Sequence, residues 1–179
     1  MTTAEVKEWF QIIAVCFTAI GLIVTIIKVR TDFKESREQK KLDLRWKQAA
    51  AGKSLNDEMQ MDEKAWAAMQ MLDSQSRKFQ IPLEDKPVDI NHSDIKKALK
   101  DEDSSLKSVY IRDCFDTLFY FMAMMHHYTE TTLIIKQDVD YPINYYLKIM
   151  KTKFHDEIAA YIEKYELVGA KKFLIANDF

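Results

Sequence analysis

The sequence is poor in the residues that interrupt helices or build small cross-linked folds. Its 179 residues include only three Gly, three Pro and two Cys. Three isolated glycines cannot form a Gly-rich phosphate loop. Cys16 and Cys114 have no second cysteine or metal-like spacing near them, which argues against a zinc or redox motif. With 30% charged residues and nine Met, the composition instead predicts an all-α chain.

The chain also lacks a basic excess in its larger part. Residues 1–47 carry nine basic and six acidic groups, a net charge of +3, whereas residues 48–179 carry 17 and 22, a net charge of −5. A nucleic-acid-binding domain usually shows the opposite sign, so no nucleic-acid partner is expected. The basic surplus near the N-terminus suits contact with anionic lipid headgroups.

One long apolar run stands out, the 18 residues FQIIAVCFTAIGLIVTII at positions 10–27. They include no charge and no proline, and as a helix they would span roughly 27 Å, close to the hydrocarbon thickness of a bilayer. A signal peptide would have a shorter apolar core and a cleavage site of small residues. A buried core helix is the other alternative, but apolar residues occur on every side of this helix. The run therefore predicts a single transmembrane helix.

The residues that flank the run predict its orientation. Residues 28–47 contain eight basic and four acidic side chains, and the positive-inside rule places that side in the cytoplasm. Residues 1–9 would form a short tail outside, with Trp9 at the interface. The basic side chains nearest the membrane, which we expect to contact lipid headgroups, are Lys28, Arg30, Lys34 and Arg37.

Small and polar residues form a stripe within the run. Gln11, Ala14, Thr18, Gly21 and Thr25 follow one another at intervals of 3, 4, 3 and 4, which places them along one side of a helix. Small residues let two helices approach closely, and Gln or Thr can form hydrogen bonds between them. The stripe predicts self-association or docking on a partner's transmembrane helix. Its alternative is chance, since such residues are tolerated facing lipid.

After the run, residues 28–51 read as a basic helical stalk that ends at Gly52. Residues 52–179 would form a cytosolic helical bundle. A helix capped by Asp62 is expected first, followed by an extended loop, rather than a strand, over 74–89. The remaining expectations are a short helix capped by Ser93, a central core helix over 106–132 capped by Ser104 or Ser105, a helix capped by Asp138, and a last short helix set apart by Gly169.

Candidate catalytic groups are few. Arg112, Asp113 and Asp116 lie on the otherwise apolar central helix, and a buried ionised group must be paired, so we expect structural ion pairs within or between helices. A catalytic carboxylate pair is the alternative. His126 and His127 are adjacent and point about 100° apart, so they cannot chelate one metal ion from one helix face. No cofactor or metal is expected.

Several segments carry a resemblance to a known group of proteins. The chain combines an anchor and a basic stalk with AWAAMQMLD (65–73), YIRDCFDTLFYF (110–121), DVDYPINYYL (138–147) and KKFL (171–174). In this order it resembles a family of short bacterial membrane-anchored helical proteins of unknown function. The resemblance implies a location in the bacterial inner membrane. It brings no activity and no site residues.

Three functional hypotheses follow. The first is a non-enzymatic interaction and assembly module, in which the anchor tethers a cytosolic helical domain that binds a protein partner or itself. The second is a membrane-acting effector in stress or phage defence, in which several anchors cluster through the stripe. The third is an enzyme with an unrecognised site that includes Asp113 or Asp116.

Overall fold

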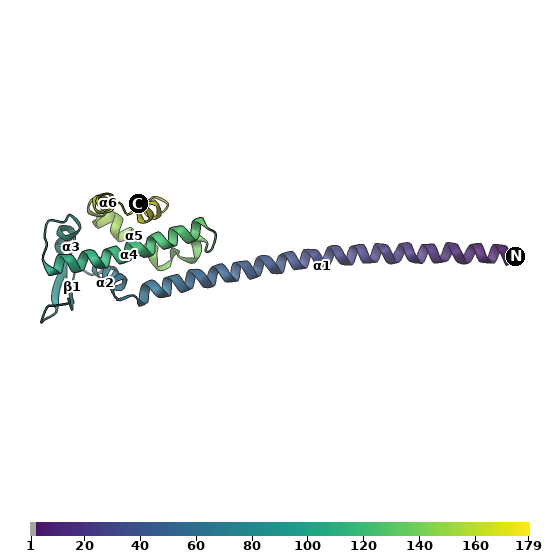
Figure 1. The fold of residues 1–179 in the computed structure, drawn as a ribbon, viewed down its shortest axis with the longest axis horizontal. Coiled ribbons are helices and arrows are strands. Elements are labelled where there is room, and N and C mark those ends of the chain that lie inside the picture. Colours follow the sequence, from purple (N-terminus) through teal and green to yellow (C-terminus); the bar gives the residue numbers. More distant parts are fainter. Residues whose placement is uncertain (1–2) are drawn as a thin grey trace. The chain divides into compact units, whose positions relative to one another are not determined.

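The computed structural model describes residues 3–179, with the backbone alone for residues 3–8, 10–12 and 14. Over this range the chain forms seven α-helices, one 3₁₀ helix and two short strands (Figure 1). In chain order the elements are α1 (Thr3–Met61), α2 (Glu63–Asp73), β1 (Ser76–Phe79), β2 (Val88–Asn91), α3 (His92–Leu99), α4 (Leu106–Glu130), η1 (Lys136–Asp138), α5 (Asp140–Lys153), α6 (His155–Lys164) and α7 (Val168–Ile175). The predicted helical class is confirmed, with a small hairpin added.

Two compact units divide the chain, Met1–Trp46 and Lys47–Phe179. Helix α1 contributes to both, because it continues through Gly52 to Met61. The predicted helix end at Gly52 is therefore wrong. Gly52 stays helical where η1 packs very close to it: a Cβ built on Gly52 would lie 2.7 Å from the Cβ of Asp138. This glycine serves close packing rather than helix termination.

The first unit consists of helix α1 up to Trp46. Its large apolar side chains from position 13 to 29 are each 45–71% exposed, and they include Phe17, Ile20 and Ile27. Among the residues whose side chains are described, no helix has both the length and the apolarity needed to cross a membrane. Four of the 18 residues in the predicted span (Phe10, Gln11, Ile12 and Ala14) lie outside that set.

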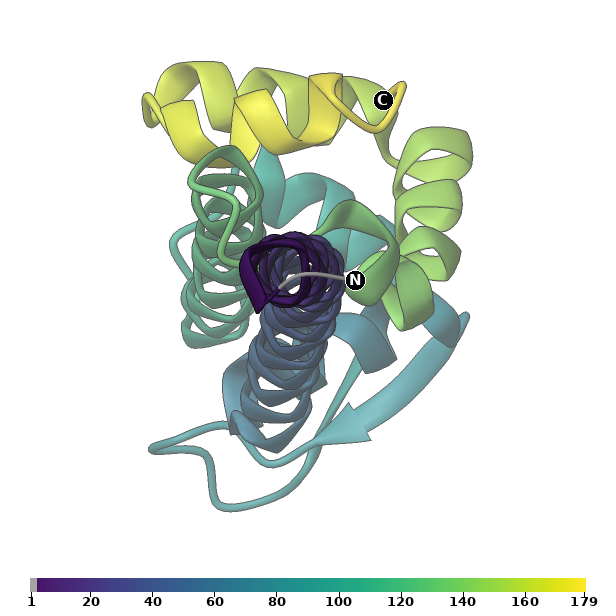
Figure 2. The same cartoon turned by 90° about the vertical axis from the view of Figure 1, so that its right-hand side faces the viewer.

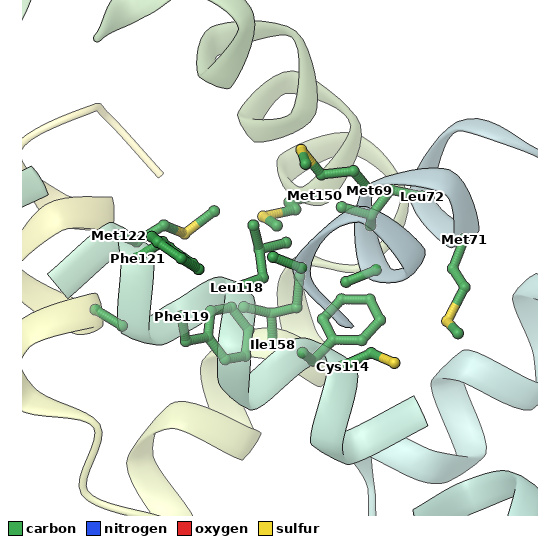
Figure 3. Packing of buried hydrophobic residues seen from close by; sticks show 14 of the residues in the cluster. Met69, Met71, Leu72, Cys114, Leu118, Phe119, Phe121, Met122, Met150 and Ile158 are labelled. Atoms are coloured by element: carbon green, nitrogen blue, oxygen red, sulfur yellow. The ribbon is translucent and has the colours of Figure 1, made fainter. Parts of the chain in front are cut away.

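The second unit is built around α4, as the apolar content of its sequence predicts. Buried residues of α4 recur on more than one side of the helix, because α2, α3 and α7 all pack against it. Figure 3 shows side chains from α2, α4, α5 and α6 meeting in this core. In both overall views α6 lies on one side of this unit and the hairpin on the opposite side (Figures 1 and 2). Among the largest fully buried side chains are Phe115, Phe119, Phe154 and Tyr161.

Two of the predicted helix caps are confirmed and two are wrong. The Asp62 carboxylate accepts hydrogen bonds from the first backbone amides of α2, and Ser105 caps α4. Helix α3 is capped by Asn91 instead of Ser93, because the carboxylate of Asp94 also accepts a hydrogen bond from the backbone amide of Asn91 and completes a capping box. Asp138 belongs to η1, and α5 begins after it at Asp140.

The expected loop over residues 74–89 contains strands at its ends. Strands β1 and β2 pair antiparallel, with Ser76 opposite Asn91 and Phe79 opposite Val88. Both prolines of the segment lie between the strands, where no ladder hydrogen bond is required. Phe79 and Ile90 are buried and fasten the hairpin to the core. The prediction that this segment contains no strand is therefore wrong.

Gly169 was expected to separate the last helix, but it lies inside the first turn of α7. Helices α4 and α7 approach so closely that a Cβ on Gly169 would lie 2.6 Å from the Cβ of Ala123. Real Cβ atoms do not come this close to backbone-fixed atoms, so the two helices require a glycine here.

We expect Gly169→Ala to destabilise the second unit by about 1–3 kcal/mol, because the added methyl overpacks the α4–α7 contact. Urea unfolding of the full chain measures the effect. Gly21→Ala is the matched control, since a Cβ at Gly21 meets no atom within 4 Å. Adding Ala123→Gly to the Gly169→Ala variant should restore stability. Equal effects of the two alanines would contradict the packing account.

Candidate functional site

The predicted association stripe lies along a part of α1 where the described side chains are exposed. Gln11 and Ala14 lie outside the residues with described side chains, whereas Thr18, Gly21 and Thr25 are exposed. The hydroxyl of Thr25 donates a hydrogen bond to the carbonyl of Gly21 at 2.8 Å. The hydroxyl of Thr25 is therefore hydrogen-bonded within its own helix.

The predicted headgroup contacts also lie on α1. Lys28, Arg30, Lys34 and Arg37 are all exposed. They lie on the first turns of the helix after the apolar run. These four basic side chains are therefore accessible to an external binding partner.

Three charged residues of α4, Arg112, Asp113 and Asp116, contact three different segments of the chain. The guanidinium of Arg112 lies 3.1 Å from the carboxylate of Asp101 in the α3–α4 loop. Asp113 lies 3.1 Å from the ammonium of Lys64 on α2. Asp116 accepts a 2.8 Å hydrogen bond from the hydroxyl of Tyr161 on α6. The partners of these residues therefore come from outside α4, and the i,i+4 spacing of Arg112 and Asp116 does not decide the pairing.

Sequence reasoning missed the centre of this polar network, which is Asp101. Its carboxylate contacts Lys164 at 2.6 Å and the hydroxyl of Tyr165 at 3.1 Å, besides Arg112. Its backbone is left-handed (φ 57°), a conformation that Asp adopts more often than most other non-glycine residues. The hydrogen bond from Lys164, then that from Tyr165, lowers the pKa of Asp101. Asp101 thus connects the α3–α4 loop to α4 through Arg112 and to α6 through Lys164.

Asp103 supports the same loop. Its side chain accepts hydrogen bonds from the hydroxyls of Ser105 and Ser108 and from the backbone amide of Ser105. These bonds, led by the Ser105 hydroxyl, lower the pKa of Asp103 to about 2. Its backbone carbonyl accepts from Arg112 at 3.0 Å. These hydrogen bonds order the turn that precedes α4, whose N-cap is Ser105.

A groove of about 240 Å³ lies between α4 and the start of α7. Tyr120 and Val168, 60% and 59% exposed, line it from the two helices. Asp116 also lines it. Asp116 is an exposed residue. Partial desolvation of its carboxyl group raises the pKa of Asp116, and the hydrogen bond from Tyr161 offsets part of this rise. The groove therefore combines an apolar lining with one carboxylate. Its lining residues are Asp116, Phe119, Tyr120, Ala123, Leu167, Val168, Gly169 and Ala170.

The other candidate ligands and nucleophiles are dispersed or inert. No group of three or more His, Cys, Asp or Glu within the described part of the chain could hold a metal ion. His126 lies 3.2 Å from Glu130 on the next turn of α4. Burial raises the pKa of the Cys114 thiol to about 12, so it is protonated at neutral pH and is a poor nucleophile.

No family model matches this chain, and the comparisons with curated proteins and with solved structures give no match either. The assignment of function therefore depends on the geometry and chemistry of the chain's own residues.

Proposed function

We propose that this protein is a membrane-anchored interaction and assembly module without enzymatic activity. Residues 10–27 cross the inner (cell) membrane once, residues 1–9 lie outside, and the helical domain lies in the cytoplasm. The stripe Gln11, Ala14, Thr18, Gly21 and Thr25 associates with a second copy or with a partner's transmembrane helix. The domain is thereby concentrated at the membrane surface, where it binds its partner.

The observation that carries this proposal is the exposure of apolar side chains all round α1. Burying one such side chain is worth about 1.5–3 kcal/mol relative to leaving it in water. Phe17, Leu22 and Ile27 point in different directions, and each is more than half exposed. One neighbouring protein surface would cover a single side of this helix, whereas a bilayer covers all sides at once.

Charge supports the proposed orientation. The first basic side chain after the apolar run is Lys28, and Arg30 follows within the same turn. Both are exposed, as are Lys34 and Arg37. These positions suit the anionic cytoplasmic leaflet, where each basic residue is worth about 1 kcal/mol.

The proposed absence of catalysis is supported by the roles of the charged residues on α4. Arg112 and Asp113 are each paired with a residue of another segment. The Cys114 thiol between Asp113 and Phe115 is buried. Ion pairing between two segments of the chain accounts for the position of these side chains without a role in binding a substrate.

Photo-crosslinking in membranes tests the assembly step. A photoreactive amino acid is placed singly at Thr18, Gly21 or Thr25, and at the control positions Ile20 and Ile23 on the opposite side of the helix, about 140–200° from Thr18. We expect discrete adducts from the stripe positions and several-fold less from the controls. An adduct of twice the chain's mass identifies a second copy, and another discrete mass identifies a partner. Absence of adducts, or equal yields on both sides, would overturn assembly through the stripe.

A further inference from the structure

The groove between α4 and α7 has a defined chemical character. Gly169 and Ala123, where the two helices approach closely, are among its lining residues. Of its eight lining residues, Asp116 alone has a carboxyl group, and the others are apolar or aromatic. Tyr120 presents an exposed ring beside this carboxylate.

Asp116 has unused capacity for a cation. A carboxylate can accept about four hydrogen bonds, and one of its oxygens accepts from the buried Tyr161 hydroxyl. The two cations that act on this carboxylate have other partners, since Arg112 pairs with Asp101 and Lys64 pairs with Asp113. Within the described residues, no cation lies in salt-bridge distance of Asp116.

We propose that this groove binds a small alkylammonium cation, with the Asp116 carboxylate as its counter-ion and the Tyr120 ring and Val168 against its alkyl groups. Aromatic faces attract cations, and the attraction is largest for organic ammonium groups that carry little hydration. Hard metal ions such as Ca²⁺ require six or more oxygen ligands, which this apolar lining does not supply. The site does not depend on whether residues 10–27 cross a membrane.

The test is a titration of isotope-labelled full-length protein in nonionic micelles, followed by NMR. One arm adds free n-butylammonium chloride, a second adds a phosphocholine lipid, and potassium chloride at equal ionic strength is the blank. We expect saturable shifts of amides in α4 and α7. Saturation by the amine alone identifies a free ligand, and saturation by the lipid identifies a headgroup. No saturable shift in either arm overturns the proposal.

Two variants locate the site. Asp116→Asn keeps an oxygen that can accept from Tyr161, so the fold should persist, but it should weaken binding about tenfold or more. Glu130→Gln is the matched control: this carboxylate lies on the same helix, next to His126, and does not line the groove, so binding should not change. If Asp116→Asn binds as tightly as the unaltered protein, the proposed site is wrong.

The pH dependence gives an independent readout. Binding needs the ionised carboxylate, so affinity should fall as the pH is lowered through the pKa of Asp116, which desolvation raises above its ordinary value. The groups that act on this carboxylate are Tyr161 from α6, Arg112 and Asp113 from α4, and Lys64 from α2. Asp116→Asn should abolish the pH dependence, whereas an unchanged pH profile in that variant would place binding elsewhere.

Discussion

Replacing both Phe17 and Ile20 with arginine is expected to release the protein from the membrane. These side chains lie near the centre of the apolar run and are 71% and 58% exposed. An arginine at the centre of a membrane-spanning helix costs about 2.5–3.5 kcal/mol, so two cost about 5–7 kcal/mol. This is comparable to the entire apolar advantage of a marginal span.

The measurement is fractionation of expressing cells, followed by an alkaline carbonate wash and flotation of the membranes through a density gradient. Flotation separates true membrane protein from sedimenting aggregates. The unaltered protein should float with the membranes, and the double-arginine variant should not. The matched control carries arginine at Phe33 and Leu42, two exposed apolar residues of the same helix beyond the run, and it should still float.

This comparison tests whether the apolar run holds the protein in the membrane. Arginine at two central positions of the run opposes its insertion into lipid, whereas arginine beyond the run does not. Phe17 and Ile20 are three residues apart and so lie about 60° apart around the helix, and Phe17 lies about 40° from the stripe position Gly21. If the double-arginine variant still floats, residues 10–27 do not cross the bilayer, and the association of the stripe must be reconsidered outside a membrane.

Sequence reasoning predicted the elements whose signals are local. Asp62 and Ser105 precede apolar helices and cap them as expected, because an N-cap depends on residues within one turn. The many apolar residues of 106–132 likewise identified α4 as the central helix. Helix α3 begins after Asn91 rather than Ser93, because the capping box with Asp94 forms only when Asn91 is the N-cap.

The features that sequence reasoning missed are those formed between distant residues. The hairpin depends on pairing Ser76 with Asn91 across 15 positions, and neither short strand shows a clear alternating pattern by itself. The hydrogen bond between Asp116 and Tyr161 joins residues 45 positions apart. Its existence depends on how α6 is placed against α4, which no local spacing determines. The groove has the same origin, because only the packing of α7 on α4 creates it.

Phe115→Ala is expected to be the most destabilising single substitution considered for the second unit. Phe115 is completely buried on α4, and its ring contacts that of Phe119 at a centroid separation of 6.0 Å. Truncating a buried phenylalanine costs about 3–5 kcal/mol, because transfer free energy is lost and a cavity remains. For a domain of this size the melting temperature should fall by about 10 °C or more.

Tyr120→Ala is the control that separates burial from simple loss of an aromatic ring. Tyr120 lies on the same helix but is 60% exposed, so its truncation removes little buried area and should cost about 1 kcal/mol or less. Urea unfolding of both full-length variants, followed by near-UV circular dichroism, gives the two values. The loss of unfolding free energy in Phe115→Ala should therefore exceed that in Tyr120→Ala by at least about 2 kcal/mol. Comparable losses would mean that α4 does not form the centre of the core.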